Sequence, residues 1–190
     1  MNTDLVNSRS IRAIIAVAAL ATATTSLDAQ AAPTVGSIAP DFSLPAATKD
    51  GILPQNVSLA GLRGRTVVIA FFPKARTPGC THQMEAYRDQ FATLFNEGKD
   101  VTVLAVSTDD PETLREWAAE QKFPVTFVSD ERGVLAKPYD VKYPAINMYR
   151  RVLFVVAPDG KVTHVMRPFK ELSADAYTEL ATAVKKAGAK

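Results

Sequence analysis

The strongest constraint on the fold is a pair of long apolar runs with a helical pattern between them. Residues 66–72 and 101–107 are rich in β-branched, aliphatic and aromatic side chains. Continuous apolar runs of this length are typical of strands that are buried on both faces of a sheet. Apolar residues recur at helical spacing over 80–97, and Gly98 stands where a C-terminal cap belongs. The pattern therefore predicts a strand, a helix and a second strand.

The rest of the chain continues the alternation and adds hairpins. Asp110 and Pro111 have the residue types of a helix N-cap and first helical position. Further expected elements are two short strands within 41–58 around Lys49-Asp50-Gly51, a strand at 125–128, a short helix at 132–137, a hairpin of 152–156 and 161–166, and a helix at 174–186. This order predicts an α/β protein with a thioredoxin-like fold, in which helices flank a central mixed sheet and an N-terminal β-hairpin precedes it.

The first 31 residues have the organisation of an export signal. Arg9 and Arg12 precede the apolar run 14–23, and residues 29–31 (AQA) have the small-x-small pattern of a cleavage site. The run is shorter than the roughly 20 residues that cross a bilayer as a helix. We therefore expect a secretory signal peptide at 1–31, one domain at 32–190, and a periplasmic or secreted protein that is not held in a membrane after cleavage. A buried amphipathic helix is the alternative.

Two residue counts narrow the possible functions. The chain has 22 Lys plus Arg against 20 Asp plus Glu, a net charge of +2, which does not favour nucleic acid as a partner. Its single cysteine, Cys80, excludes an intramolecular disulfide, a Cys-x-x-Cys pair and a cysteine-rich zinc site. We expect no cofactor and no metal, because His82 and His164 have no companion ligands. An unpaired cysteine in an exported protein is either buried and inert or kept for chemistry.

The segment before Cys80 has the features of a thiolate site. It leaves the C-terminal end of a predicted central strand, where open α/β sheets place their sites. Pro73, Pro78 and Gly79 stiffen this loop and allow the backbone to approach a ligand closely. Cys80 stands at the start of the next predicted helix, where free N–H groups and the helix dipole stabilise an anion.

The helix dipole alone does not ionise an ordinary thiol at neutral pH. Lowering a cysteine pKa from about 8.5 to about 6 requires about 3.4 kcal/mol. A dipole contributes about 0.3 to 1 kcal/mol, or about 2 kcal/mol when it is partly buried. A cation or a hydroxyl donor must supply the remainder. The candidates are Thr77, Arg76, Arg150 and Arg151, and the sequence does not specify their distances from the sulfur.

The pattern Pro73-x-x-x-Thr77-x-x-Cys80 after an apolar strand resembles the peroxidatic motif of the peroxiredoxin family of AhpC/TSA type. Residues 77–81 (TPGCT) are similar to its bacterioferritin-comigratory, or peroxiredoxin Q, branch. The resemblance continues through 39–44 (APDFSL), 106–109 (VSTD), 129–133 (SDERG) and 151–161 (RVLFVVAPDGK). It therefore covers nearly the whole chain after the signal segment.

The resemblance implies a thiol-dependent peroxidase that reduces hydrogen peroxide, organic hydroperoxides or both. The thiolate of Cys80 would attack a peroxide and become a sulfenic acid. Thr77 would hydrogen-bond the thiolate and the peroxide, and Pro73 would shield the sulfur. Arg151 would stabilise the thiolate and the departing oxygen. Arg150 is the alternative, because a shift of one residue turns a strand side chain to the other face.

The backbone N–H groups of Gly79 and Cys80 complete the implied substrate cradle. The sequence departs from the branch at Glu85, where many peroxiredoxin Q proteins carry a resolving cysteine. We therefore expect a one-cysteine variant, recycled by an external thiol that is thioredoxin-like, glutaredoxin-like or of low molecular weight. Monomer and homodimer are both compatible with the sequence. The alternative function is a non-catalytic thioredoxin-fold binding module that forms mixed disulfides through Cys80.

Overall fold

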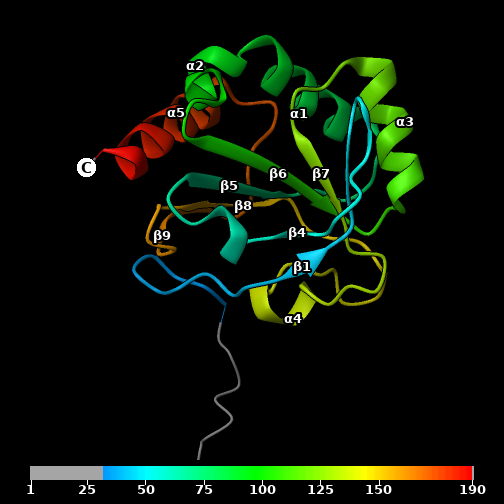
Figure 1. Cartoon of the computed structure of the whole chain (residues 1–190), viewed down its shortest axis with the longest axis horizontal. Coiled ribbons are helices and arrows are strands. Elements are labelled where there is room, and N and C mark those ends of the chain that lie inside the picture. Colours follow the sequence, from blue (N-terminus) through cyan, green and yellow to red (C-terminus); the bar gives the residue numbers. More distant parts are fainter. Residues whose placement is uncertain (1–31, 190) are drawn as a thin grey trace, which may run out of the picture.

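A seven-stranded mixed sheet forms the centre of the molecule (Figure 1). The computed structural model describes residues 32–189, and the predicted signal peptide at 1–31 lies outside the described residues. The strands are β1 (Ser43–Leu44), β2 (Ala46–Thr48), β3 (Gly51–Ile52), β4 (Val57–Ser58), β5 (Thr66–Phe71), β6 (Val101–Ser107), β7 (Thr126–Ser129), β8 (Val152–Val156) and β9 (Val162–Met166). The sheet order is β3-β2-β7-β6-β5-β8-β9, and β1 and β4 pair as a second, small sheet.

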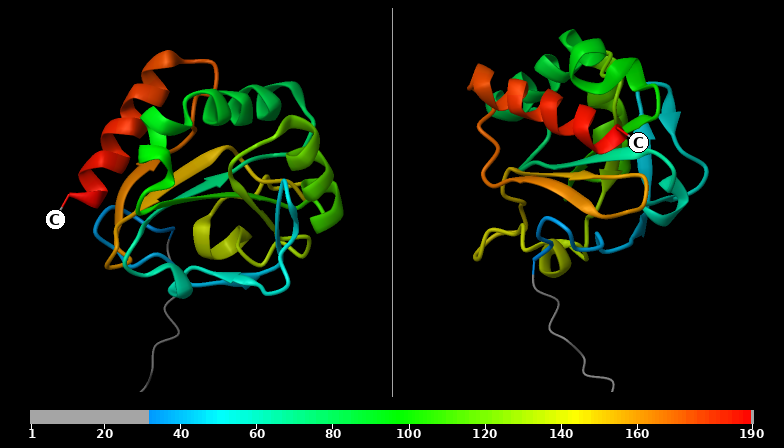
Figure 2. Two further views of the ribbon diagram at one scale, coloured as in Figure 1. Left: turned by 45° about the horizontal axis from the view of Figure 1, so that its top comes forward. Right: turned by 90° about the vertical axis from the view of Figure 1, so that its left-hand side faces the viewer.

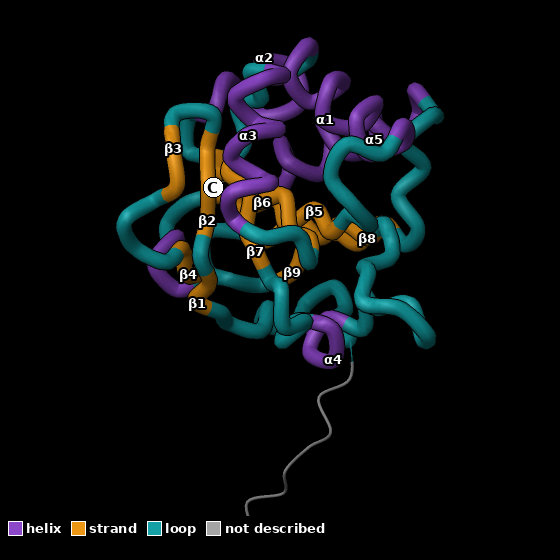
Figure 3. The backbone as a smooth tube through the Cα atoms, turned by 90° about the vertical axis from the view of Figure 1, so that its right-hand side faces the viewer, coloured by secondary structure: helices purple, strands orange, loops and turns teal. Residues whose placement is uncertain are grey.

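Most of the helical structure covers one face of this sheet. The helices are α1 (Pro78–Asp89), α2 (Phe91–Phe95), α3 (Pro111–Gln121), α4 (Ala136–Tyr139) and α5 (Ala174–Gly188), with 3-10 turns at Ala60–Leu62 and Asn96–Gly98. Figure 3 shows α1, α2, α3 and α5 on one side of the strands and α4 on the other, beside the β1–β4 sheet. Figure 2 shows the same layers from two further sides. The predicted α/β class, with helices flanking a mixed sheet, is confirmed.

The two faces of the sheet build two separate cores. In β5 every residue is buried. Val68 and Ala70 belong to the core beneath the four helices, whereas Val67, Ile69 and Phe71 belong to the core on the α4 side. The continuous apolar run in the sequence follows directly from this arrangement, because alternate side chains of a strand point to opposite faces and both faces are covered.

Strand pairing confirms the predicted β-α-β crossovers. β5 runs parallel to β6, and β6 runs parallel to β7. β8 joins the other side of β5 in antiparallel orientation and forms a hairpin with β9. The predicted N-terminal hairpin is β2–β3, in which Thr48 pairs with Gly51, and β2 extends the sheet beside β7. The C-terminal ends of β5 and β6 therefore lie side by side at one edge.

The helix predicted over 80–97 differs from the structure at its start and in its middle. It begins at Pro78, because Thr77 has the extended backbone of an N-cap and Pro78 occupies the first helical position. Cys80 is therefore the third helical residue. The helix is interrupted at Gln90, whose φ of −114° is outside the helical range, and continues as α2. The break lets α2 pack against α5.

The short helix predicted over 132–137 is also displaced, to α4 at 136–139. The carboxylate of Asp130 accepts the backbone N–H groups of Val134 and Leu135 at 2.8 and 2.9 Å. These two bonds hold residues 130–135 as a turn, so that the helix starts only after it. Local competition between a side-chain acceptor and the helical pattern decides this boundary.

Candidate active site

Cys80 lies in the first turn of α1, just beyond the C-terminal end of β5. Phe72 still pairs with β6 through its N–H, which donates to Val106 O at 3.0 Å, and residues 73–77 then form the connecting loop. In α1 the N–H of Thr81 donates to Thr77 O at 2.8 Å, which closes the first helical turn around Cys80. The cysteine itself is 0% exposed. Burial alone fits an inert core thiol equally well, so its polar neighbours decide the interpretation.

Arg151 is the cation that contacts the sulfur. Its Nη2 donates to Sγ of Cys80 at 3.5 Å, and its side chain is only 11% exposed. Arg151 immediately precedes β8, the strand that lies beside β5. Arg150 extends elsewhere, and its Nη2 lies 3.0 Å from Oδ1 of Asp140. Of the two neighbouring arginines that the sequence left open, Arg151 is the one at the thiol.

The third arginine candidate is also directed away from the sulfur. Arg76 lies in the loop itself, but it forms a salt bridge with Glu120 of α3 and a second one with Glu116 at 3.6 Å. This pairing attaches the loop to α3. Arg76 therefore supports the loop from outside, and the charge beside Cys80 comes from Arg151, at the start of β8.

Two further side chains fix the guanidinium of Arg151. Its Nη1 donates to Oε1 of Gln83 at 2.5 Å, and its Nε lies 3.2 Å from Oε2 of Glu171. Gln83 is fully buried, and its Nε2 donates to the phenol oxygen of Tyr87 at 2.8 Å. Burial raises the pKa of Tyr87 above its usual range, so that the phenol stays neutral. The arginine is thus held by one neutral acceptor and one carboxylate.

Glu171 is placed by contacts of its own backbone and of its neighbours. Its carbonyl oxygen accepts the phenol of Tyr177, from α5, at 2.8 Å. Burial raises the pKa of Tyr177 to about 12, so the phenol remains a donor at neutral pH. The N–H of Phe169 donates to Arg151 O at 3.0 Å. The segment 169–171 therefore runs alongside Arg151 and presents Glu171 to it.

Gly79 lets the loop approach this ion pair. A Cβ atom at position 79 would lie 2.7 Å from Oε1 of Glu171 and 3.1 Å from Nη2 of Arg151, which is too close for an unperturbed pair. Gly79 and Cys80 are the second and third residues of α1, so their N–H groups have no intrahelical acceptor. Glycine is needed at position 79 because the backbone there passes close to the side chains of Glu171 and Arg151.

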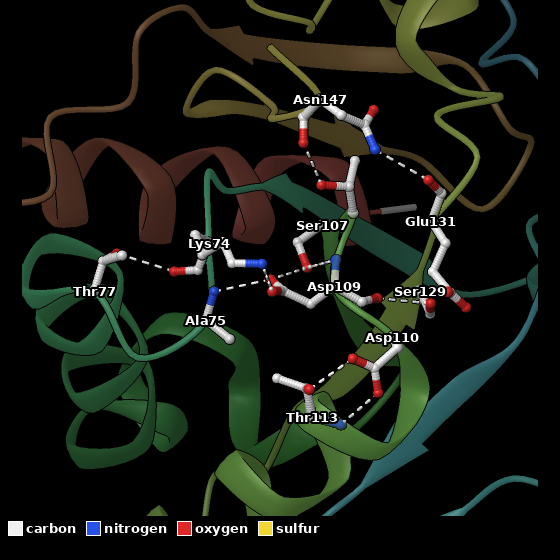
Figure 4. Close-up of polar contacts among 11 residues, drawn as sticks. Lys74, Ala75, Thr77, Ser107, Asp109, Asp110, Thr113, Ser129, Glu131 and Asn147 are labelled. Atoms are coloured by element: carbon white, nitrogen blue, oxygen red, sulfur yellow. Dashed lines mark hydrogen bonds and ion pairs between the residues drawn. The ribbon is translucent and has the colours of Figure 1, made fainter.

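The predicted residues Thr77 and Pro73 stand at the two ends of the loop that joins β5 to α1. The hydroxyl of Thr77 donates to Lys74 O at 2.9 Å (Figure 4). Its proton is thus directed to the loop backbone, and its oxygen keeps free acceptor capacity. Pro73 is half-buried and lines the cavity next to Arg151.

A buried carboxylate for which the sequence predicted no contact with the loop holds the start of that loop. Asp109 is 3% exposed, and its Oδ2 accepts the N–H of Ala75 and the hydroxyl of Ser107, both at 2.9 Å. Its Oδ1 lies 2.7 Å from Nζ of Lys74 (Figure 4). Because Asp109 follows β6 and the loop follows β5, this carboxylate ties together the ends of the two parallel strands.

The neighbouring Asp110 has the role that the sequence predicts for it. Its Oδ1 accepts the N–H of Thr113 at 2.9 Å, which makes it the N-cap of α3. The bonds that Asp110 accepts from Thr113 are local, whereas Asp109 also contacts Ala75 and Lys74, which lie more than thirty positions away. A sequence pattern detects the first kind of contact and misses the second.

A cavity of about 790 Å³ opens beside the arginine cluster. Pro73 and Arg151, the residue that contacts the thiol, are part of its lining, and the segment 167–173 forms a long stretch of the wall. Within residues 32–189, no group of three or more His, Cys, Asp or Glu side chains is arranged to hold a metal ion. No helix in this described range has the length and apolar character needed to span a membrane.

The fold and this site together define a thioredoxin-like α/β protein with one arginine-bound thiol at the start of a helix. The AhpC/TSA family matches residues 35–165. "Peroxiredoxin Bcp" of Escherichia coli (strain K12) is 38% identical over 144 residues, which cover 71% of this chain and 86% of that protein. The chain therefore belongs to the AhpC/TSA family, as its motif predicts, and is similar to the Bcp and peroxiredoxin Q branch.

Solved structures confirm the fold. The crystal structure of peroxidoxin BcpB from Mycobacterium tuberculosis superposes with a TM-score of 0.68 at 28% identity, covering 83% of this chain and 99% of that one. A structure of the Xanthomonas campestris bacterioferritin comigratory protein gives a TM-score of 0.64 at 26% identity, with 76% and 92% covered. Both superpositions cover more than three quarters of this chain.

Proposed function

We propose that the protein is a thiol-dependent peroxidase that reduces hydrogen peroxide and organic hydroperoxides through Cys80. Family membership supports peroxidase activity. The contact of 3.5 Å between Nη2 of Arg151 and Sγ of Cys80 carries the assignment of the residues. A guanidinium and a helix N-terminus both stabilise a thiolate, and the thiolate is the nucleophilic form of cysteine. Alkyl peroxide reduction is described for the Xanthomonas campestris protein, which supports the organic class.

In the first half of the cycle, the thiolate of Cys80 attacks the terminal oxygen of the peroxide. The O–O bond breaks, and its electron pair leaves with the other oxygen of the peroxide. That departing oxygen takes a proton and becomes water or an alcohol. Cys80 keeps the transferred oxygen as a sulfenic acid. Arg151 stabilises the negative charge that develops on the departing oxygen.

The loop residues bind and orient the peroxide. The hydroxyl of Thr77 gives its own proton to Lys74 O and therefore accepts a hydrogen bond from the peroxide O–H. The N–H groups of Gly79 and Cys80 donate to the peroxide oxygens. Because Cys80 is fully buried, the peroxide enters from the cavity past Pro73, which keeps bulk water from the sulfur.

The second half of the cycle requires a thiol from another molecule. The chain has a single cysteine, and the position five residues after it is Glu85. A donor thiolate attacks Sγ of the sulfenic acid, forms a mixed disulfide and releases water. A second donor thiol then reduces the mixed disulfide. With the expected signal peptide at 1–31, this one-cysteine peroxidase would work in the periplasm or outside the cell.

The test compares the purified protein with Cys80→Ser. We expect the wild type to gain one oxygen atom with one equivalent of peroxide, as seen by intact mass, and to turn over peroxide with a dithiol donor. Cys80→Ser should consume peroxide no faster than buffer. A wild-type thiol that reacts with peroxide only as fast as free cysteine would support the binding-module alternative and reject the peroxidase.

A further inference from the structure

The cavity beside Cys80 is charged unequally. Its charged lining side chains are Arg150, Arg151, Arg167, Lys170 and Glu171. Four of these are basic and one is acidic. The volume of about 790 Å³ is in the range that holds small organic molecules, roughly 300 to 1,000 Å³. The cavity therefore favours a small anionic ligand, provided that its positive charges are not neutralised by residues behind the lining.

Two of the arginines share a single carboxylate behind the wall. Arg150 lies 3.0 Å and Arg167 lies 3.2 Å from the two carboxylate oxygens of Asp140. One carboxylate balances one guanidinium, so this group keeps a surplus positive charge. Burial lowers the pKa of Arg167, Asp140 opposes that change, and the nearby positive charge of Arg150 adds to it. By contrast, Arg151 is balanced by Glu171.

Lys170 supplies a second surplus charge. Its side chain is exposed at the cavity, and no acidic side chain among residues 32–189 forms an ion pair with it. The cavity thus presents two positive charges that no salt bridge within residues 32–189 balances, one at the Arg150–Arg167–Asp140 group and one at Lys170. Beside them lie apolar surfaces, including Leu172, which is 78% exposed, and Tyr143, which is 40% exposed.

The burial of Cys80 limits which thiol can reach it. Sγ is covered in the folded protein, and the cavity is lined by Arg151, the residue that contacts it. A cysteine on the surface of a rigid protein cannot approach Sγ unless the first turn of α1 opens. A small molecule in the cavity instead lies against Arg151, the residue that contacts Sγ.

We propose that this cavity binds a low-molecular-weight thiol that carries carboxylates, and that this thiol reduces the oxidised Cys80. The inference rests on the proposed peroxidase function and names the class of reductant. The carboxylates lie at Lys170 and Arg167, and the thiol points to Cys80. The donor thiolate attacks Sγ of the sulfenic acid, the S–O bond breaks, and the oxygen leaves as water after taking a proton. A second donor molecule attacks the mixed disulfide and leaves as the donor disulfide, which returns Cys80 to its thiolate.

The experiment separates the two half-reactions. The protein is oxidised with one equivalent of peroxide and then mixed with glutathione, 2-mercaptoethanol or cysteamine, which are anionic, neutral and cationic thiols. Intact mass follows the mixed disulfide, and rates are corrected for the thiolate fraction of each donor. Lys170→Glu is compared with Lys185→Glu, a matched exposed lysine on α5 that is not part of the cavity lining.

We expect Lys170→Glu to slow the glutathione reaction about three- to tenfold and to accelerate the cysteamine reaction, since reversal of one nearby charge has this effect in water. Added salt should reduce both effects. Lys185→Glu should change neither rate. S-methylglutathione, which cannot react, should bind the wild type more tightly than Lys170→Glu in calorimetry.

Equal glutathione rates and equal S-methylglutathione binding in wild type and Lys170→Glu would overturn the inference. If peroxide still oxidised Cys80 rapidly in that case, the peroxidase proposal would stand. If Lys170→Glu altered only the reaction with a carboxylated hydroperoxide, the cavity would serve the peroxide, and the assignment to a thiol would be wrong. Failure of peroxide to oxidise Cys80 in the wild type would reject both proposals.

Discussion

Two groups of opposite charge hold the loop 73–77 and the first turn of α1, and the two differ in how they are satisfied. Asp109 accepts bonds from Ser107, Ala75 and Lys74, and it is 3% exposed. Arg151 divides its donors among the thiol, an amide and a carboxylate, and it also lines the cavity. The carboxylate therefore acts as a fixed anchor, whereas the guanidinium faces the place where charge changes during the reaction.

The comparison predicts that loss of the guanidinium affects chemistry most strongly. Arg151→Met removes the cation beside Sγ, and we expect the rate of Cys80 oxidation by hydrogen peroxide to fall about 100-fold or more. Stopped-flow competition against a reference thiol measures this rate. Arg76→Met is the matched control, because that loop arginine pairs with α3. A rate within threefold of the wild type would show that Arg151 is structural only.

Loss of the anchor should affect stability first. Asp109→Ala leaves a backbone N–H and a serine hydroxyl without their acceptor, which costs about 3 kcal/mol of unfolding free energy. Urea denaturation measures the change, and a moderate loss of peroxide reactivity, about tenfold, should accompany it through loosening of the loop. Lys74→Met should cost less than about 1 kcal/mol, because this partner is 55% exposed. Equal costs for both variants would contradict the anchor.

A substitution at Gly79 should displace the guanidinium of Arg151 and leave the carboxylate of Asp109 in place. Gly79→Ala places a methyl group against the Arg151–Glu171 pair, and we expect the peroxide rate to fall about three- to tenfold with little change in stability. The control is Gly188→Ala, where the added Cβ lies 3.4 Å from Oγ1 of Thr66. Stopped-flow rates and urea midpoints measured together test this separation. If Gly79→Ala lost as much stability as Asp109→Ala, the two groups would not differ in the way proposed.

The smallest effect is expected at the residue next to the anchor. Asp110→Ala removes the N-cap of α3 and should cost about 1 kcal/mol, with no change in the peroxide rate. Hydrogen bonds from the Thr113 hydroxyl and N–H lower the pKa of Asp110. This contribution is therefore complete above the unfolded pKa, about 3.9, and declines as the pH falls through the lower folded value. Denaturation at pH 7 and pH 3 should show a smaller difference between Asp110→Ala and wild type at the lower pH.

Much of the scaffold was predictable because its signals are local. The apolar runs of β5 and β6 reflect burial on both faces, and Asp110 with Pro111 marks the start of α3. Two helix boundaries were predicted wrongly, at the start of α4 and at Gln90. Asp130 delays α4 by accepting two backbone N–H groups, and the break at Gln90 divides the predicted long helix.

The sequence predicted the motif around Cys80, but it did not predict the residues that hold Arg151 and the loop in place. Gln83 had a weak local signal, since it lies three residues after Cys80 and hence on the same side of α1. Glu171 and Asp109 had none that pointed to the thiol. Their contacts join segments that are far apart in the chain, and no spacing rule relates such positions.

The sequence by itself determined the α/β class, the family motif around Cys80 and the presence of one cysteine only, because these depend on residue types and on short-range periodicity. Only the tertiary structure decided that Arg151, and not Arg150, contacts the sulfur, and that one side of the cavity carries surplus positive charge. The physical reason is that adjacent residues at the start of a strand point in different directions, and only the packing of β8 beside β5 selects which of them meets α1.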